Sequence, residues 1–239
     1  MIPLPDKKYS IIYADPPWGY QNRGTRAAAS KHYGTMTVEE LKKMDVGAAG
    51  GGGIANSDCA LFMWATFPML REALEVIEAW GFTYKTVAFN WVKQNKTGAG
   101  LFWGLGNWTR SNSEICLLAV KGKPKRVSAS VHSVILSPIQ QHSRKPAEAR
   151  DRIVELMGDL PRIELFARET APGWDSWGNE VPTAGTRTEE TDGTAHYIRG
   201  AGEHETAAPA GSCGSAQPAG LRQGEGVPRG QGAPVGMDY

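Results

Sequence analysis

An uncharged, mostly apolar run, Cys59-Ala-Leu-Phe-Met-Trp-Ala-Thr66, most strongly limits the folds open to this chain. Its eight residues match the length of a strand, and a strand that is apolar at almost every position must be buried on both faces. Apolar residues then recur at helical spacing from Pro68 to Trp80, and Gly81 follows as a helix end. A buried strand followed by an amphipathic helix is the basic unit of an α/β sheet that helices cover.

The same alternation continues through residues 9–181. We predict further strands at 9–14, 84–93, 114–121, 134–137 and 162–167. We predict further helices from Thr37-Val-Glu-Glu40, which has capping-box spacing, to about Met44, and from Pro146 to Met157. Strands and helices in this order predict an α/β domain with a mostly parallel sheet. Asp15 and Arg168 would then follow the carboxyl ends of two strands, where such sheets bind ligands.

The composition changes after Val181. All 8 tryptophans and all 6 phenylalanines precede that point, whereas 17 of the 58 residues from Pro182 to Tyr239 are glycine or proline and only four are Leu, Ile, Val or Phe. Such a segment cannot bury enough apolar area to offset its ordering entropy. We therefore predict a folded domain at 1–181 and a disordered Gly/Pro-rich tail at 182–239, with a segment that folds on a partner as the alternative.

Charge and cysteine content exclude several classes of protein. A net charge of +1, from 26 basic and 25 acidic side chains, means that any nucleic-acid surface must be local. The 3 cysteines form no C-x-x-C pair, which argues against a disulfide scaffold or a cysteine zinc site and fits a cytoplasmic protein without a metal. No apolar run reaches the roughly 20 residues of a membrane span, and the first residues do not form a signal peptide.

The tetrapeptide Asp15-Pro16-Pro17-Trp18 is the most specific feature of the sequence. Its residues suit the methylation of an exocyclic amine. The lone pair of such an amine is delocalised into its ring, so a catalyst must hold acceptors against the two N–H bonds before the nitrogen can attack the methyl group. A carboxylate and the carbonyl of a residue followed by proline supply two rigidly placed acceptors. Trp18 offers a face on which a base can stack. The alternative is that Asp-Pro-Pro is only a turn and Trp18 a core aromatic.

The tetrapeptide and His32-Tyr-Gly-Thr-Met36 resemble the MT-A seventy (MT-A70) family of S-adenosylmethionine-dependent adenine-N(6) methyltransferases, in its bacterial and phage form. The similarity covers nearly all of residues 9–181 and none of the tail. Its other segments are Phe62-Met-Trp-Ala65, Asn90-Trp-Val-Lys93, Ser113-Glu-Ile-Cys-Leu-Leu-Ala-Val-Lys-Gly122, His142-Ser-Arg-Lys-Pro146, Arg162-Ile-Glu-Leu-Phe-Ala-Arg168, Gly173-Trp174 and Gly178-Asn179-Glu180.

The resemblance implies a Rossmann-like class I methyltransferase sheet in circularly permuted order, with helices on both faces. The chain lacks a G-x-G-x-x-G loop. Permutation accounts for this, because the catalytic loop then comes first and the cofactor strand, Ile163 to Ala167, comes late in the chain. Larger members of the family have a further acidic residue upstream of the tetrapeptide, and here only 14 residues precede Asp15.

The resemblance also implies a set of site residues. The catalytic residues would be Asp15, Pro16, Pro17 and Trp18. The cofactor S-adenosylmethionine would be bound by Asp15, Lys145, Arg168, Asn179 and Glu180. The substrate would be bound by Trp18, Tyr33 and Glu114. Packing under the loop is the alternative for Tyr33, and simple solvation is the alternative for Glu114. We expect Trp174 and Trp177 to pack rather than to touch ligand.

These residues predict methyl transfer from S-adenosylmethionine to N(6) of adenine in nucleic acid, with DNA favoured over RNA. The alternatives are a non-catalytic nucleic-acid-binding subunit and an enzyme that methylates a protein amide. Loops Gly19–Thr35 and Thr97–Ser113, the latter with Trp103 and Trp108, are candidate substrate loops. Basic residues that could track phosphates are Arg23, Arg26, Lys31, Lys93, Lys96, Arg110 and the run Lys121-Gly-Lys-Pro-Lys-Arg126. The sequence leaves the oligomeric state open.

Overall fold

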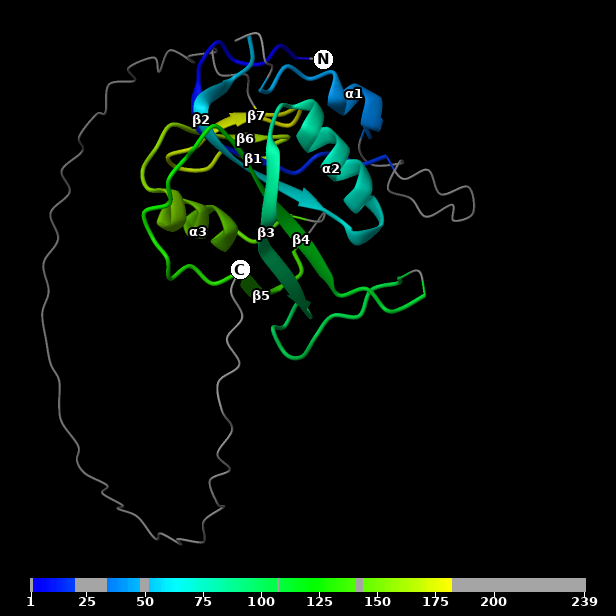
Figure 1. The fold of residues 1–239 in the computed structure, drawn as a ribbon. Coiled ribbons are helices and arrows are strands. Elements are labelled where there is room, and N and C mark those ends of the chain that lie inside the picture. Colours follow the sequence, from blue (N-terminus) through cyan, green and yellow to red (C-terminus); the bar gives the residue numbers. More distant parts are fainter. Residues whose placement is uncertain (1, 20–33, 48–51, 107, 141–143, 182–239) are drawn as a thin grey trace, which may run out of the picture. The chain divides into compact units, whose positions relative to one another are not determined.

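The computed structural model describes residues 2–19, 34–47, 52–106, 108–140 and 144–181. Its strands form one seven-stranded sheet in the order β5-β3-β4-β2-β1-β6-β7 (Figure 1). The strands are β1 (Tyr9–Ala14), β2 (Ala55–Ala65), β3 (Thr83–Gln94), β4 (Ser113–Lys121), β5 (Val134–Pro138), β6 (Arg162–Leu165) and β7 (Asp175–Trp177). The predicted tail at 182–239 and Tyr33 lie outside the described residues.

Six of the strands run in one direction and β4 runs in the other. β1 is parallel to β2 and β6, β6 is parallel to β7, and β3 is parallel to β5. β4 lies antiparallel between β2 and β3. The prediction of a mostly parallel sheet is therefore confirmed. Apolar periodicity does not encode the direction of a strand, and so the sequence did not single out β4.

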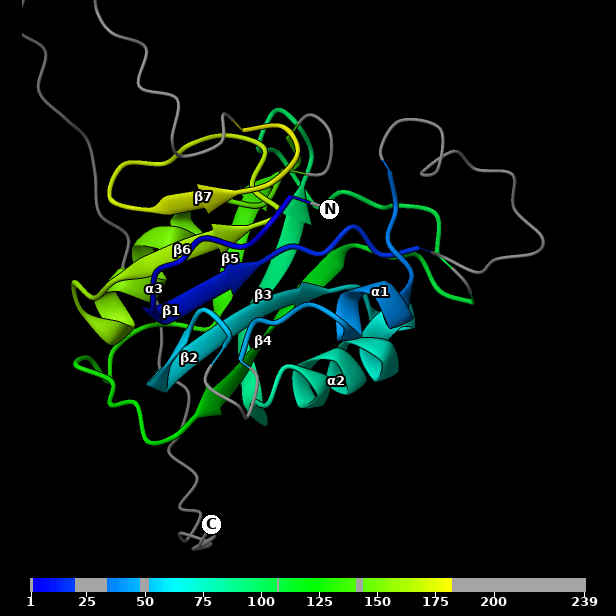
Figure 2. The same cartoon turned by 90° about the horizontal axis from the view of Figure 1, so that it is seen from above.

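Helices cover both faces of the sheet, as expected (Figures 1 and 2). Helices α1 (Val38–Lys42) and α2 (Leu70–Ala79) pack on one face, where α2 follows a 3₁₀ turn, Phe67–Met69. Helix α3 (Glu148–Met157) packs on the other face. Buried side chains of α2, such as Val76 and Ile77, and of α3, such as Ile153, belong to two separate hydrophobic cores.

The two cores follow from the period of two along each central strand. In β1, Ile11 and Tyr13 join the core under α3, whereas Ile12 and Ala14 join the core under α2. β2 alternates in the same way, and its residues from Cys59 to Ala65 are all buried. The structure thus confirms that the run around Cys59–Thr66 is a strand buried on both faces, although the strand begins four residues earlier, at Ala55.

Helix α1 begins with the predicted capping box. The Glu40 amide donates to Thr37 Oγ1 at 3.2 Å, and the Thr37 amide donates to Glu40 Oε2 at 2.7 Å. The helix ends at Lys42, before the predicted end near Met44. Strand β7 was not predicted, because three residues are too short for a periodic pattern to register.

The last strands of the chain lie beside the first one. β6 pairs with β1 so that Leu165 lies opposite Ala14, and the Asp15 amide donates to the Leu165 carbonyl at 3.4 Å. The sheet therefore has the Rossmann-like order expected of a permuted methyltransferase, with the late strands β6 and β7 on the side of β1 away from β2, and β1 leads into the Asp15–Trp18 loop. Within the described ranges, no helix has the length and apolarity to cross a membrane, and no group of three His, Cys, Asp or Glu could hold a metal.

Candidate active site

Asp15 lies directly after β1, at the edge where the parallel strands end. Two prolines turn the chain there, and backbone hydrogen bonds connect the turn to the segment before α1. The Met36 amide donates to the Pro17 carbonyl at 2.9 Å, and the Gly19 amide donates to the Met36 carbonyl at 3.2 Å. Proline restricts both its own φ and the residue before it, so the loop is held in one shape.

The Pro16 carbonyl, expected from the sequence to hold the target amine, already accepts one hydrogen bond. The Trp18 amide donates to it at 2.9 Å. A carbonyl oxygen has two lone pairs, so one acceptor position remains. The role of Pro16 as an acceptor for substrate stays a prediction.

Trp18 packs in the core on the α2 face. Its side chain is 7% exposed, and its indole Nε1 donates to the Trp64 carbonyl at 3.0 Å. The arrangement matches the alternative interpretation of Trp18 as a core aromatic that fixes the loop after Pro17. Little of the ring is exposed to solvent, which limits the area on which a base could stack. Stacking of a base on Trp18 stays a prediction.

Asp15 ends a line of alternating charges that the sheet brings together. Lys145 Nζ lies 2.7 Å from Asp15 Oδ2 and 3.3 Å from Glu114 Oε2, and Lys93 Nζ lies 2.5 Å from Glu114 Oε1. Glu114 is the second residue of β4, and because β4 is antiparallel its first residues lie at the same edge as the last residues of β2 and β3. The antiparallel direction of β4 therefore brings Glu114 close to the Asp15–Trp18 loop.

The pKa values of this cluster reflect burial and the alternation of charge. Burial raises the pKa of Asp15 above its usual value, and Lys145 offsets only part of that rise. Burial would also raise the pKa of Glu114, but Lys145 and Lys93 together outweigh it and lower that pKa. Burial would lower the pKa of Lys145, whereas Asp15 and Glu114 outweigh it and raise that pKa. The lysine thus stays charged, and Asp15 is the more basic of the two carboxylates relative to its usual value.

Each of the two lysines lies close to the ring of a tryptophan. Lys145 Nζ lies 5.7 Å from the ring centroid of Trp64, and Lys93 Nζ lies 5.0 Å from that of Trp91. Trp64 Nε1 donates to the Tyr13 hydroxyl at 2.6 Å, which fixes its ring. Contacts of this kind stabilise a cation that has left bulk water. The sequence did not assign Trp64, Tyr13 or this role of Lys93, because their meeting depends on strand register.

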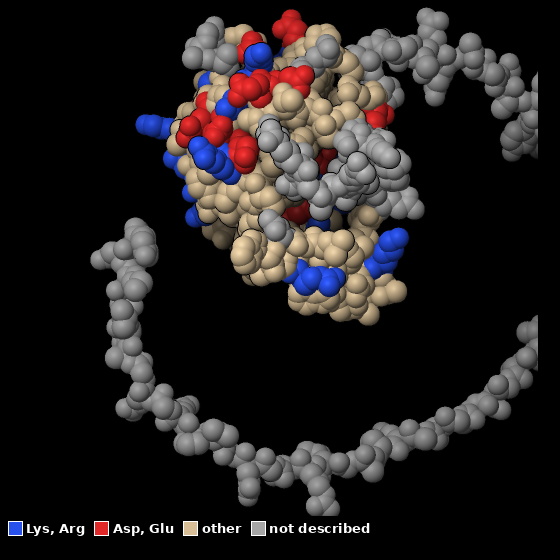
Figure 3. Space-filling model, turned by 90° about the vertical axis from the view of Figure 1, so that its right-hand side faces the viewer, with Lys and Arg blue, Asp and Glu red and all other residues tan. Residues whose placement is uncertain are grey.

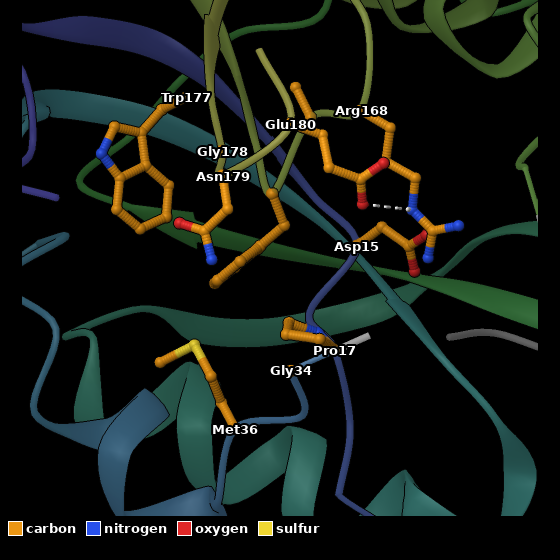
Figure 4. Close-up of a pocket in the computed structure, with 11 residues that line it drawn as sticks. Asp15, Pro17, Gly34, Met36, Arg168, Trp177, Gly178, Asn179 and Glu180 are labelled. Atoms are coloured by element: carbon orange, nitrogen blue, oxygen red, sulfur yellow. Dashed lines mark ion pairs between the residues drawn. The ribbon is translucent and has the colours of Figure 1, made fainter. Parts of the chain in front are cut away.

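A cavity of about 550 Å³ opens beside Asp15 (Figure 4). In Figure 4, Asn179 and Trp177 lie on one side, Asp15, Arg168 and Glu180 on the other, and Pro17 and Met36 below. The cavity is lined by Asp15, Pro17, Gly34, Met36, Phe166, Ala167, Arg168, Trp177, Gly178, Asn179 and Glu180. Arg168 Nε lies 3.9 Å from Glu180 Oε1. Four residues that the sequence assigned to a cofactor therefore line one cavity.

Close backbone packing between β6 and β7 shapes this cavity. The Ala167 amide donates to the Trp177 carbonyl at 3.0 Å, and a Cβ on Gly178 would lie 2.2 Å from the Ala167 carbonyl oxygen. Only glycine fits at such an approach. Trp177 was expected to pack, and it does so through a bond from its Nε1 to the Pro3 carbonyl at 3.0 Å, but it also lines the cavity.

A smaller cavity of about 240 Å³ adjoins the first and shares Asp15, Phe166, Arg168 and Glu180 with it. Lys145 also lines it. Its lining includes an ion pair that the sequence did not indicate, in which Arg150 Nη1 lies 2.6 Å from Glu164 Oε2.

The structure separates the basic residues into two groups. Lys93 lies near the end of β3 at the Asp15 edge, whereas Lys121 ends β4 opposite Cys59, at the far edge of the sheet. The run Lys121–Arg126 therefore begins at the end of the strands opposite the candidate site and does not flank Asp15. The reversed direction of β4 is again the reason. Arg23, Arg26, Lys31 and Tyr33 lie outside the described residues.

Comparisons with known proteins show which family the sequence matches. The family model MT-A70 matches residues 9–180. The type II methyltransferase M.MunI of a Mycoplasma species is 38% identical over 199 residues, which cover 75% of this chain and 80% of the relative. A putative N(6)-adenosine-methyltransferase MT-A70-like of Medicago truncatula is 32% identical over 178 residues, 73% of this chain and 26% of the relative. The human N(6)-adenine-specific methyltransferase METTL4 is 28% identical over 191 residues, 73% of this chain and 38% of the relative.

Proposed function

This chain belongs to the MT-A70 family of S-adenosylmethionine-dependent methyltransferases, and from that premise we propose that it methylates the N(6) amine of adenine in DNA. The observation that carries the proposal is the position of Asp15. Its carboxylate lines the 550 Å³ cavity and is held at 2.7 Å by Lys145. A donor in the cavity and an amine in front of the loop would both lie against this one group.

The residues around the cavity suit S-adenosylmethionine. A volume of 550 Å³ falls in the usual range for a cofactor of this size. The Asn179 amide presents a donor and an acceptor to an adenine edge, and the Glu180 carboxylate can accept from ribose hydroxyls. Phe166, Met36 and Trp177 provide apolar surface for the ring. When bound, the cofactor supplies an electrophilic methyl group.

Asp15 and the backbone of Pro16 would then orient the amine. Acceptors against both N–H bonds draw the nitrogen away from conjugation with its ring and aim its lone pair at the methyl group. The nitrogen gains a positive charge as it attacks, and a carboxylate beside it stabilises that charge. Burial raises the pKa of Asp15, so the same carboxylate is better able to take the proton that the nitrogen must lose.

Lys145 and Glu114 keep that carboxylate in place. Lys145 bonds both carboxylates, and Glu114 is itself held by Lys93. A side chain locked by such contacts enters the reaction with its orientation already set. We assign two roles to Lys145, which are to position Asp15 and to bind the carboxylate of the cofactor's methionine part. We assign Glu114 to binding the substrate.

Two observations favour DNA over RNA. The chain is most similar, among the relatives named above, to the type II methyltransferase, and it spans 80% of that protein. It spans only 26% of the MT-A70-like N(6)-adenosine-methyltransferase, so most of that relative has no counterpart in the match. An enzyme that methylates DNA must meet it in the cell, and we therefore place this protein in the cytoplasm.

The test is transfer of a labelled methyl group to plasmid DNA, to RNA and to total protein, followed by digestion to nucleosides. We expect label in N(6)-methyladenine from DNA. Asp15→Ala should remove the signal and keep the fold. Asp159→Ala is the matched control, because that carboxylate is 89% exposed and precedes β6 at the opposite edge of the sheet.

The outcome separates the alternatives. Label in RNA adenosine alone would make this an RNA methyltransferase. Label in protein alone would favour an amide methyltransferase. Binding of nucleic acid without any label, in a protein that binds the donor, would favour a non-catalytic subunit.

A further inference from the structure

The connection between β3 and β4 contains a protruding hairpin, which we call the finger and define as residues 102–106 and 108–112. Figure 1 shows it projecting away from the ends of β3 and β4. It rises from the site itself, since the Phe102 amide donates to the Lys93 carbonyl and the Lys93 amide to the Asn112 carbonyl, both at 2.8 Å. The root of the finger is therefore the residue whose side chain holds Glu114.

The two arms of the finger are clamped together. The Gly104 amide donates to the Ser111 carbonyl at 2.8 Å. Arg110 reaches across the hairpin, with its Nε at 2.8 Å from the Gly104 carbonyl and its Nη2 at 2.8 Å from the Trp103 carbonyl. The arginine thus bonds two carbonyls that would otherwise face only water. An ordered hairpin with this bracing can present its tip in a defined place.

The tip carries large apolar side chains that the described part of the protein leaves open to solvent. Trp108 is 100% exposed, Leu105 is 95% exposed and Trp103 is 55% exposed. The backbone at the tip is tight: a Cβ on Gly106 would lie 1.9 Å from the Thr109 carbonyl oxygen, and Trp108 has a φ of 74°. A left-handed tryptophan is unusual. Here it belongs to a turn that directs an indole away from the protein.

The charge on this segment favours nucleic acid as the partner. Between Lys93 and Ser113 the sequence contains Lys96 and Arg110 and no acidic residue. In Figure 3 the lobe at the bottom carries Lys and Arg side chains and no acidic ones on the visible face, whereas acidic side chains gather near the top. Exposed indoles beside cations that have no acidic neighbours match bases and phosphates.

We propose that the finger is a wedge that enters the DNA stack beside the target adenine, with Trp108 at its tip taking the place of the extruded base. The proposal rests on the proposed function. The N(6) amine cannot reach Asp15 inside a duplex, so the base must be turned out of the stack. Apolar side chains inserted between base steps lower the free energy of such an opened state. Four residues span at most roughly 13 Å when fully extended, which exceeds the roughly 8.5 Å depth of the major groove.

A second copy of the chain is the other occupant to consider. The tip of the finger mixes apolar side chains with glycines, and its root, Lys93, belongs to the charge cluster around Lys145. A polynucleotide whose base reaches Asp15 would pass this root, because Lys93 pairs with Glu114 and Glu114 with Lys145. A dimer that covered the finger would place a protein where the substrate strand has to pass.

The test compares two duplex oligonucleotides built around an adenine that the protein marks in unmethylated plasmid DNA. In one duplex, the target adenine is paired with thymine. In the other, it lies opposite an abasic site, which leaves the adenine unpaired and lowers the free energy needed to turn it out of the stack. We expect Trp108→Ala to lower kcat/KM on the paired duplex by roughly 5- to 150-fold, the loss of one stacked aromatic. On the abasic duplex the fall should stay within about twofold, because less opening is needed.

Tyr84→Ala is the matched control, because Tyr84 is an exposed aromatic near the start of β3, at the other edge of the sheet. It should leave both duplexes unaffected. Equal losses on both duplexes, or no loss on either, would overturn the wedge. Conversion of a dimer to a monomer by Trp108→Ala in sedimentation, with equal loss on both, would assign the finger to a contact between copies. If the unmutated protein labels neither duplex nor plasmid, the proposed function fails first and the wedge falls with it.

Discussion

Lys145→Met is the change that most directly tests the charge cluster at the site. It removes a cation while keeping much of the apolar side-chain volume. Lys145 Nζ lies 2.7 Å from Asp15 Oδ2 and 3.3 Å from Glu114 Oε2, and the exposed fractions of these side chains are 11%, 23% and 13%. Removing one partner of a fully buried pair destabilises by about 3–5 kcal/mol, because the other charge is left uncompensated.

Water at the partly exposed Asp15 reduces this figure, and we expect a loss of about 2–4 kcal/mol in the free energy of unfolding at neutral pH. In a domain of this size each kcal/mol lowers Tm by roughly 2–4 °C. The expected fall in Tm is therefore roughly 4–16 °C. Lys145→Arg keeps the charge and should lose much less.

The sign of the pH dependence follows from the two carboxylates. The pKa of Glu114 is lowered in the fold, so its stabilising contribution is present above its usual value of 4.5 and is lost as the pH falls. The pKa of Asp15 is raised in the fold by burial, and without Lys145 it rises further. Ionised Asp15 therefore destabilises the variant at neutral pH, and its protonation on acidification relieves that loss.

The assay is thermal unfolding of the unmutated protein, Lys145→Met and Lys145→Arg, followed from neutral to acidic pH. We expect the gap between the methionine variant and the unmutated protein to narrow as the pH falls. A gap that stays constant with pH would mean that the loss comes from packing rather than charge. A methionine variant as stable as the unmutated protein at neutral pH would refute the reasoning altogether.

Three further predictions concern the cavity, the loop and the nucleic-acid surface. Gly178→Ala should weaken S-adenosylmethionine binding by at least roughly tenfold in calorimetric titration, because its Cβ would meet a carbonyl oxygen at 2.2 Å; unchanged affinity would argue against that cavity as the donor site. Trp18→Phe should lower the free energy of unfolding in urea by about 1 kcal/mol, from the lost bond to the Trp64 carbonyl at 3.0 Å, and no loss would mean that the bond contributes nothing. Lys96→Ala should reduce the salt slope of DNA binding by about 1, whereas Lys125→Ala, beyond the far end of β4, should leave the slope unchanged; the reverse result would move the DNA to the other edge.

Much of the fold could be predicted from local patterns. β1 has the predicted bounds, Tyr9–Ala14, and β4 differs from its prediction by one residue at its start. The capping box at Thr37 is a local signal and was confirmed. Helix α3 begins at Glu148 rather than Pro146, because the first residues form a turn in which the Ala149 amide bonds the Pro146 carbonyl at 3.1 Å. Such errors at element ends are typical of pattern reasoning.

The candidate site divides in the same way. Asp15, Arg168, Asn179 and Glu180 were predicted and line one cavity. Lys145, which the resemblance assigned to the cofactor together with Asp15, lies 2.7 Å from Asp15 Oδ2. Their catalytic and binding roles stay predictions. Three contacts of the site could not be predicted from the sequence. They are the ion pair of Lys93 with Glu114, the contact of Lys145 with the Trp64 ring, and the Arg150–Glu164 ion pair.

The sequence by itself determined the elements and the chemistry available to them, because strand burial, helix period and a proline-locked Asp-Pro-Pro turn depend on neighbours a few residues apart. Only the tertiary structure decided which of these side chains lie next to one another. The reversed direction of β4 brings Glu114 to Asp15 and takes the Lys121–Arg126 run to the far edge. Strand direction and register depend on contacts between residues far apart in the chain, and no local pattern records them.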